Sequence, residues 1–507
     1  MNVARARLRC FSLRGQHRDS VARGAALISA FAFGCGAIAE EPSPAHHRKP
    51  EAADAWSGLP DASAPPPVPP PPPDCPSSAK VPDLVRLEAV PVPPGVTADF
   101  AVRGGNPTLA VAANGDATLV WETTGAIASR TYRGSRWLDI EPVAAGSPYY
   151  SGYDVGPKLA ARPDGSFVVA YNVYPTSSDR VICTRERVPD GSWLPPATLA
   201  TTGTGWWQQP DPPLYELVAD AFGNVTALVR ALEPVSPNAS WPTGLLAFRA
   251  PAGGHFGDPT VLTTAEPWRF ALTADANGAA IAVWDDHGSD WLLRAAAFSG
   301  TEWGDARPPA LGDGALALAS ERDRGVTVLG AGRVDGTIRL EAATRRLDGT
   351  WTEVTDLGAV PDDIAKATIV ADDAGRALAT RTSFAFGPGC MHTSALARRD
   401  ASGAWTSWEE IPGAPPEKTS IATAARSTTG HALIVWQEER SNDGNVCLVD
   451  TAYHLSWISA SGTWSSAMML DAGPSLLGAT VAFAPTGRAL VAWRHDDLVL
   501  VRWIDPP

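Results

Sequence analysis

The sequence predicts an all-β protein, a β-propeller of about eight four-stranded blades, and three observations carry the prediction. A glycine turn followed by an apolar strand recurs eight times. A second glycine turn that leads to an aromatic residue follows in most copies, and the copies lie 47 to 58 residues apart. Internal periods of this size are typical of solenoids, propellers and arrays. Four short strands in each repeat, with glycine turns after the first and third strands, describe a propeller blade.

The first glycine turn is the most regular part of the repeat. A small or polar residue precedes the glycine, as suits a tight turn with positive φ. In five copies an aromatic residue follows six positions later: Gly115 with Trp121, Gly165 with Tyr171, Gly278 with Trp284, Gly430 with Trp436, and Gly487 with Trp493. Weaker copies start at Gly223, Gly325 and Gly375. If the weak fifth copy is irregular, seven blades is the alternative.

The strand after this turn is apolar on both faces. Runs such as AIAV (280–283) and ALIV (432–435) do not alternate with polar residues, so both faces are expected to be buried. Strands stacked between neighbouring blades meet this requirement. A row of β-sandwiches is the alternative, but one sandwich needs about 100 residues, which is longer than the repeat.

The second glycine turn resembles the Asp-box of sialidase-like (BNR-repeat) propellers, whose motif is Ser/Thr-x-Asp-x-Gly-x-Thr-Trp. Segments 189–193, 347–351 and 400–405 come nearest, with glycine and Trp in place and the Asp displaced. The resemblance covers roughly 81–507. It implies that the box lies opposite the binding face, with its Trp packed between strands. That role falls to Trp193, Trp351, Trp405 and Trp464.

The same resemblance does not extend to sialidase activity. Sialidases need an arginine triad, a Tyr–Glu nucleophile pair and an acid Asp, and the sequence has no Arg-Ile-Pro motif near the first blade. Because fold does not imply function, a sialidase is not expected.

The two ends of the repeat region are expected to meet. The chain stops after the third strand of the eighth repeat, at DLVLVRWIDPP. Segment 81–95 precedes the first repeat and resembles a fourth strand. We expect it to complete the last blade and to remove an open edge.

Residues 1–39 form a signal peptide, with a basic start that contains six arginines and an apolar segment, 24–34, too short to span a bilayer. Two processing sites remain open. Residues 32–35 resemble a lipobox, which would lipidate Cys35, and we favour this reading; residues 37–39 form an A-x-A site that would release a soluble chain. Both imply export, to the cell envelope as a lipoprotein or to the periplasm or medium.

Composition agrees with an exported protein. Residues 40–80 are rich in Pro, Ala and Ser and predict a disordered linker before the propeller at 81–507. The chain carries a net charge of −14, and −19 without residues 1–39. This acidity argues against nucleic-acid binding. Contact with a membrane is expected only through the lipid anchor, and the protein is expected to be a monomer.

The cysteines suggest one disulfide. Cys390 and Cys447 occupy related places in adjacent repeats, so a bond between neighbouring loops is expected; two free thiols are the alternative. Cys183 lies in a strand and is expected to be a buried apolar residue. No Cys/His spacing indicates zinc, and no metal or cofactor is expected.

Function is expected where the connections are long. Those between second and third strands, and between one repeat and the next, are long and aromatic, whereas the opposite rim has short glycine turns. Their aromatic residues offer flat faces to a ligand such as a sugar ring, although some of them are expected to cover the bases of the loops instead. The predicted ligand-binding residues are Tyr149, Tyr150, Tyr153, Trp206, Trp207 and Trp241.

The segment TADANGAAIAVWDDHGSD (273–290) poses the question of a catalytic or metal site at Asp285, Asp286 and His287. Polar residues recur at this place in other repeats, so we interpret the cluster as a solvated rim; a metal or catalytic site is the alternative.

These observations predict an exported, lipid-anchored binding module for carbohydrate or a protein ligand. A polysaccharide hydrolase or lyase acting on the same face is the alternative, and a structural surface protein is a third possibility. No group of residues demands catalysis, so the chain is not expected to be an enzyme.

Overall fold

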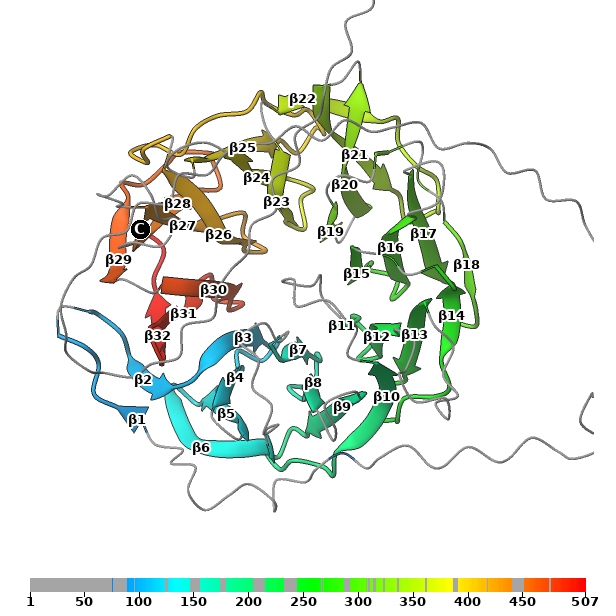
Figure 1. The fold of residues 1–507 in the computed structure, drawn as a ribbon, viewed down its shortest axis with the longest axis vertical. Helices are drawn as coiled ribbons and strands as arrows, with labels where there is room; N and C mark the ends of the chain where they lie inside the picture. Colours follow the sequence, from blue (N-terminus) through cyan, green and yellow to red (C-terminus); the bar gives the residue numbers. More distant parts are fainter. Residues whose placement is uncertain are drawn as a thin grey trace, which may run out of the picture. The chain divides into compact units, whose positions relative to one another are not determined.

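The structure is a computed structural model. The residues that it describes are 75, 89–94, 96–123, 126–145, 156–173, 179–203, 215–231, 244–265, 267, 269–286, 292–306, 308, 311–312, 316–321, 324–334, 337–360, 363–385, 391–416, 418–439, 451–473 and 476–507. All regular structure in this part of the chain is β and forms eight antiparallel sheets arranged as the blades of a propeller (Figure 1). None of the described residues belongs to a helix that is long and apolar enough to cross a membrane.

Blades 1 to 4 are four-stranded sheets that follow the chain from the centre of the ring outward (Figure 1). Blade 1 contains β3 (Gly105–Val111), β4 (Ala117–Thr123), β5 (Ala126–Arg133) and β6 (Arg136–Ala145). Blade 2 contains β7 (Lys158–Ala161), β8 (Phe167–Val173), β9 (Asp179–Arg187) and β10 (Ala197–Gly203). Blade 3 contains β11 (Tyr215–Ala219), β12 (Val225–Ala231), β13 (Gly244–Ala250) and β14 (Thr260–Thr263). Blade 4 contains β15 (Phe270–Ala274), β16 (Ala280–Asp286), β17 (Leu292–Phe298) and β18 (Trp303–Asp305).

Blades 5 to 8 continue the same order. Blade 5 contains β19 (Leu316–Glu321), β20 (Gly325–Val334), β21 (Thr337–Arg345) and β22 (Thr355–Val360). Blade 6 contains β23 (Asp363–Ala371), β24 (Ala377–Ala385) and β25 (Met391–Arg399), and blade 7 contains β26 (Thr419–Arg426), β27 (Ala432–Glu439), β28 (Thr451–Ile458) and β29 (Met468–Gly473). Blade 8 contains β30 (Leu476–Phe483), β31 (Ala489–His495) and β32 (Leu498–Ile504). The weak fifth repeat forms a regular four-stranded sheet, so the count of eight is confirmed over seven.

The sheet of blade 8 also contains strands from before the first blade. β2 (Phe100–Arg103) pairs with β32, and β1 (Ala89–Val90) pairs with β2. The segment expected to lie against β32 was 81–95, so the strand that does so begins later than predicted. Prolines at 91, 93 and 94 cannot donate to a ladder, whereas Phe100, Ala101 and Val102 are buried in the core.

The second strand of the repeat is buried on both faces, as predicted. The aromatic residues Trp121, Tyr171, Trp436 and Trp493 expose 1% or less of their surface, and Trp284 exposes 6%. The core therefore consists of clusters between neighbouring blades. One of them joins Leu433 of β27 to Val491 of β31.

Three of the turns between first and second strands share one side-chain hydrogen-bonding pattern. In blade 4, Oδ1 of Asp275 accepts the N–H groups of two later turn residues, both at 2.9 Å. Gly278 closes this turn with a φ of +77°, a conformation that favours glycine. Asp220 and Asp372 accept N–H groups in the same way in blades 3 and 6. An aspartate three residues before the glycine is thus a further turn signal in these three blades.

The turns that resemble the Asp-box have the structural role that the resemblance implies. Oδ1 of Asp190 accepts the backbone N–H of Ser192 at 2.8 Å, and Asp348 and Asp400 hold their own turns in the same way. The four turn tryptophans pack against the hydrophobic clusters, as expected of Trp193, Trp351, Trp405 and Trp464.

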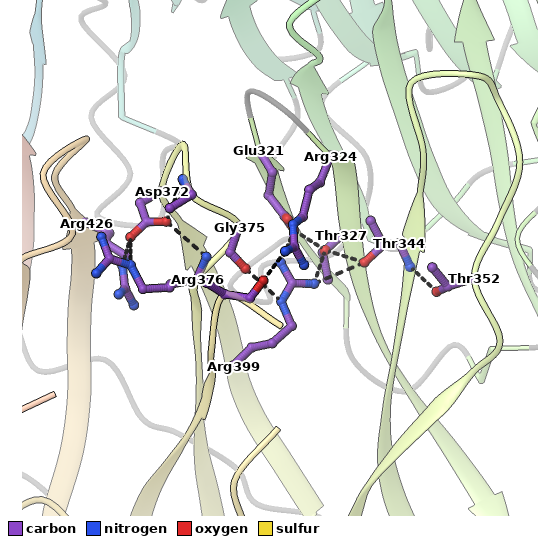
Figure 2. Close-up of polar contacts among 12 residues, drawn as sticks. Glu321, Arg324, Thr327, Thr344, Thr352, Asp372, Gly375, Arg376, Arg399 and Arg426 are labelled. Carbon is purple, nitrogen blue, oxygen red and sulfur yellow. Dashed lines mark hydrogen bonds and ion pairs between the residues drawn. The ribbon is translucent and has the colours of Figure 1, made fainter. Parts of the chain in front are cut away.

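Buried polar contacts join blades 5, 6 and 7 near these turns (Figure 2). Arg399 of β25 forms an ion pair with Glu321 of β19 and donates to Thr327 at 3.0 Å. Asp372 of blade 6 accepts a hydrogen bond from Arg426 of blade 7 at 2.9 Å. Figure 2 shows these contacts as two groups, one around Asp372 and one around Arg399.

One disulfide joins Cys75 to Cys183 of β9, with 5.9 Å between their Cα atoms. Cys183 was expected to be a buried residue with a free thiol. Its side chain is buried, but its sulfur forms a disulfide, so that part of the prediction is wrong. This pair was not predicted, because Cys75 belongs to the Pro-rich segment 40–80 and follows no strand pattern. The predicted pair Cys390 and Cys447 lies outside the described residues, as does Cys35.

Candidate functional site

The two rims of the ring differ in the length of their connections. Seven of the eight connections between first and second strands have five residues, for example 112–116 and 275–279. Four connections on the other rim have eleven or twelve residues: 146–157, 204–214, 232–243 and 440–450. We call the rim with the five-residue turns the short-turn rim. The opposite rim, which carries the four long connections, is the long-loop rim. The predicted ligand-binding residues Tyr149, Tyr150, Tyr153, Trp206, Trp207 and Trp241 belong to the long connections and lie outside the described residues.

The structure describes the strand ends that carry these loops. The residue after the second-strand aromatic is buried and polar in several blades. Glu122 accepts a hydrogen bond from the side chain of Asn106 at 2.8 Å, and Asn172 accepts one from the hydroxyl of Tyr215 in the next blade at 3.2 Å. These polar groups therefore tie strand ends together beneath the loops.

Asp285 occupies the same position in blade 4. It was expected to be solvated, and this expectation is wrong. Its residue is only 3% exposed. Its Oδ1 accepts the backbone N–H of Arg269 at 3.0 Å, and its own N–H donates to the carbonyl oxygen of Arg269. Asp285 was expected in water because charged residues usually end strands there, but a hydrogen bond to the neighbouring strand compensates for its burial. The Asp286 side chain and His287 are outside the description.

Blade 7 carries an imidazole on this rim. His454 of β28 lies directly across from Trp436 of β27, and the two rings stack with centroids 4.2 Å apart. Nε2 of His454 lies 3.1 Å from Oε2 of Glu438. Burial raises the pKa of the adjacent Glu439 carboxyl.

A second imidazole lies between blades 7 and 8. Nδ1 of His495, at the end of β31, is 2.8 Å from Oδ2 of Asp471 on β29. The indole N–H of Trp493 donates to the same carboxylate oxygen at 2.8 Å. The Asp471 side chain is 1% exposed, so this buried carboxylate fixes the orientation of the imidazole at the blade boundary.

These pairs can donate and accept hydrogen bonds and can position an imidazole, but they do not assemble a nucleophile with a base. Within the described ranges there is also no group of three or more His, Cys, Asp or Glu side chains that could hold a metal ion. Neither His454 nor His495 was predicted as a site residue, because a single histidine within a strand or at its end is a weak signal.

No family model and no curated protein matches the sequence. Solved structures do match the fold. An α-L-arabinanase of Penicillium chrysogenum, complexed with arabinobiose, is 16% identical over 65% of this chain and 97% of its own, with a TM-score of 0.36. An ulvan lyase of polysaccharide lyase family PL25 is 9% identical over 82% of this chain and 95% of its own, with a TM-score of 0.44. The Hadza microbial sialidase Hz136 is 11% identical over 74% and 73%, with a TM-score of 0.36. Likeness at this level concerns the strand arrangement and assigns no activity to this chain.

Proposed function

We propose that this protein is an exported binding module that takes carbohydrate on the long-loop rim. The difference between the rims carries the proposal. On the short-turn rim, seven connections between first and second strands have five residues and the longer ones between third and fourth strands have up to nine, whereas the connections of eleven or twelve residues all leave the other rim. Loops that a rigid scaffold positions are the usual place for binding residues.

The residues in these loops favour a sugar ligand. Tyr149, Tyr150 and Tyr153 lie in one connection, Trp206 and Trp207 in the next, and Trp241 in the third. Tyr and Trp combine a flat apolar face with a polar edge, which suits a sugar ring with its apolar face and its hydroxyl groups.

The described polar groups give the loops a fixed base. The carboxylates of Glu122, Asp285 and Asp471 each accept a hydrogen bond from a protein group at 3.0 Å or less. Such partners hold the bases of the loops in place and leave the carboxylates engaged in the scaffold. A loop framework of this kind supports a binding surface.

The disulfide supports export. Disulfides persist in oxidising compartments and are rare in the cytosol, and Cys75 and Cys183 form one here. The bond also ties the end of the Pro-rich segment to blade 2. We propose that residues 1–39 direct export, that Cys35 carries the lipid anchor and that residues 40–74 act as the spacer. Mass spectrometry of the mature N-terminus tests this proposal, and an unmodified chain that starts at Glu40 contradicts the anchor.

A glycan array with the full chain tests the carbohydrate ligand. Replacing Trp206 and Trp207 together with Ala is expected to abolish binding at the long-loop rim and to leave the melting temperature nearly unchanged. The reason is that each aromatic contact contributes about 0.5–1.5 kcal/mol beyond area burial. A parent protein that binds no glycan, or a double variant that binds as the parent does, contradicts the proposal.

A further inference from the structure

A cavity of about 560 Å³ lies on the short-turn rim, opposite the proposed site. The first turns of blades 3 and 4 and the second turns of blades 4 and 5 surround it. Its volume is within the range of small-molecule sites, about 300–1,000 Å³. The residues that matter for its chemistry are Phe222, Arg249, Asp275, Phe298, Arg345 and Asp348.

Phe222 is unusual for its position. It precedes the turn glycine in blade 3, where the other seven blades have Asn114, Asp164, Asn277, Arg324, Ala374, Thr429 and Thr486. Its residue is 64% exposed, although the turn itself is well ordered by a hydrogen bond from the Phe222 N–H to Asp220 at 2.9 Å. The Phe222 ring thus gives the cavity a solvent-exposed apolar face.

The Phe222 ring lies over the neighbouring turn. A Cβ atom added to Gly278 would come within 2.6 Å of Cδ2 of Phe222, so glycine is what lets the ring lie this close. Beside this turn, the guanidinium carbon of Arg249 is 4.5 Å from the ring centroid of Phe298, and Arg249 also donates to Asp220 at 2.7 Å. These contacts hold one wall of the cavity in a fixed, mixed apolar and cationic arrangement.

Arg345 supplies unused hydrogen-bonding capacity. Its buried Nε has no hydrogen-bond partner among the described residues. Its Nη1 lies 4.0 Å from Oδ2 of Asp275, which is too long for a hydrogen bond. The Asp348 carboxylate, which also lines the cavity, is at the surface and, within the part of the chain that the structure describes, accepts hydrogen bonds from its own turn residue Thr350. The Arg345 side chain is 15% exposed, so its terminal nitrogens face the cavity while its Nε stays buried.

We infer that this cavity is a second saccharide-binding site, separate from the long-loop rim. Phe222 offers a face for the apolar side of a sugar ring. Arg345 donates to its hydroxyl or carboxylate oxygens, and Asp348 accepts from its hydroxyl groups. The inference does not rest on the proposed function, because it uses residues of the opposite rim.

The test is isothermal titration calorimetry, which measures the affinity of the full chain for each of four oligosaccharides: maltohexaose, cellohexaose, arabinohexaose and hexagalacturonate. Phe222→Asn introduces the residue that blades 1 and 4 already have at this position, so the turn is expected to fold normally. We expect it to weaken binding of the recognised oligosaccharide about tenfold or more. Phe222→Trp keeps an aromatic face and is expected to retain binding. Thr486→Ala, at the same turn position in blade 8, is the matched control and is expected to change nothing.

Two results identify the ligand further. Binding of hexagalacturonate alone, weakened by Arg345→Lys, assigns a uronic acid to the cavity; binding of a neutral oligosaccharide assigns hydroxyl recognition. The variant with Trp206 and Trp207 replaced by Ala separates the rims, because a saccharide bound in the cavity keeps its affinity in that variant. Equal affinity of the parent and Phe222→Asn for every oligosaccharide overturns the inference, as does a parent protein that binds none of them.

Discussion

Arg399 of blade 6 forms an ion pair with Glu321 of blade 5, and the Glu321 residue is 0% exposed (Figure 2). The same guanidinium donates to the hydroxyl groups of Thr327 and Thr344 in blade 5 and to the carbonyl oxygen of Gly375 in its own blade. A single buried side chain thus satisfies acceptors in two blades. The boundary of blades 5 and 6 thus has buried polar contacts in addition to the apolar cluster that contains Leu329 and Ala379.

Glu321→Ala is expected to destabilise the ring by about 3–5 kcal/mol, because removing one partner of a buried pair leaves the other charge uncompensated. Urea denaturation monitored by tryptophan fluorescence measures this loss.

The control is the exposed pair of Arg103 and Asp497, whose side chains are 71% and 69% exposed. Asp497→Asn is expected to change stability by about 1 kcal/mol or less. The double variant with Glu321→Leu and Arg399→Met is expected to be more stable than Glu321→Ala, since no buried charge remains. Equal losses for the buried and the exposed pair would contradict the role of burial.

Removing the disulfide is expected to destabilise the ring. Cys75 and Cys183 are 108 residues apart in sequence, and such a cross-link restricts a large loop in the unfolded chain. Cys75→Ser is expected to cost about 2–4 kcal/mol, measured by denaturation under non-reducing conditions.

Reduction of the parent protein by dithiothreitol should lower its melting temperature to that of Cys75→Ser. If reduction shifts the parent and leaves the variant unchanged, the shift comes from this bond. Equal shifts in both proteins would assign it to other cysteines.

Deletion of β2 is expected to expose an edge of blade 8. A chain that begins at Gly104 lacks Phe100, Ala101 and Val102, which are 6%, 0% and 1% exposed and pair with β32. It is expected to aggregate or to melt at a lower temperature, because β32 then presents unpaired backbone groups. A chain that begins at Val96 keeps β2 and is the matched control, since both deletions remove Cys75. Light scattering and thermal melts compare the two, and identical behaviour would refute the role of β2.

The repeat made most of the fold predictable. A glycine that needs positive φ and an aromatic residue six positions later recur because every blade solves the same packing problem, so one pattern predicts eight sheets. The strand β2 was missed because it belongs to no repeat, and the Pro-rich segment before it looked equally extended. Asp285 was misjudged for a different reason. Its burial depends on a hydrogen bond to Arg269, which no local pattern indicates.

The candidate sites were predictable to different extents. Loop length alone indicates which rim carries long connections, since it follows from the spacing of the repeats. The pairs of His454 with Glu438 and of His495 with Asp471 depend on cross-strand register and on contacts between blades, so sequence spacing does not reveal them. The cavity beside Phe222 combines turns of three blades and has no signal along the chain beyond one aromatic residue at a turn.

The turn carboxylates are expected to titrate below the ordinary range. The backbone N–H of Ser192, followed by its hydroxyl, lowers the pKa of Asp190. A lowered pKa in the folded state means that this turn contributes stability at neutral pH, and that the contribution is lost as the pH falls from the ordinary Asp value through the lowered one. A carboxyl titration by NMR measures it. Ser192→Ala removes the hydroxyl donor and should move the pKa of Asp190 part of the way back, whereas an unchanged pKa would refute the hydroxyl's contribution.

Trp351 should behave as a structural residue, in contrast to the loop tryptophans. It packs against the cluster that contains Val326 and Val328 of β20, and its indole N–H donates to the carbonyl oxygen of Ala306 in blade 4 at 3.1 Å. Trp351→Ala is expected to cost about 3 kcal/mol, because it opens a cavity at the boundary of blades 4 and 5 and leaves that carbonyl without its donor. Thermal melts of Trp351→Ala and of the variant with Trp206 and Trp207 replaced by Ala compare the rims directly. A harmless Trp351→Ala beside an unfolded double variant would show that the structural and ligand-binding rims are assigned the wrong way round.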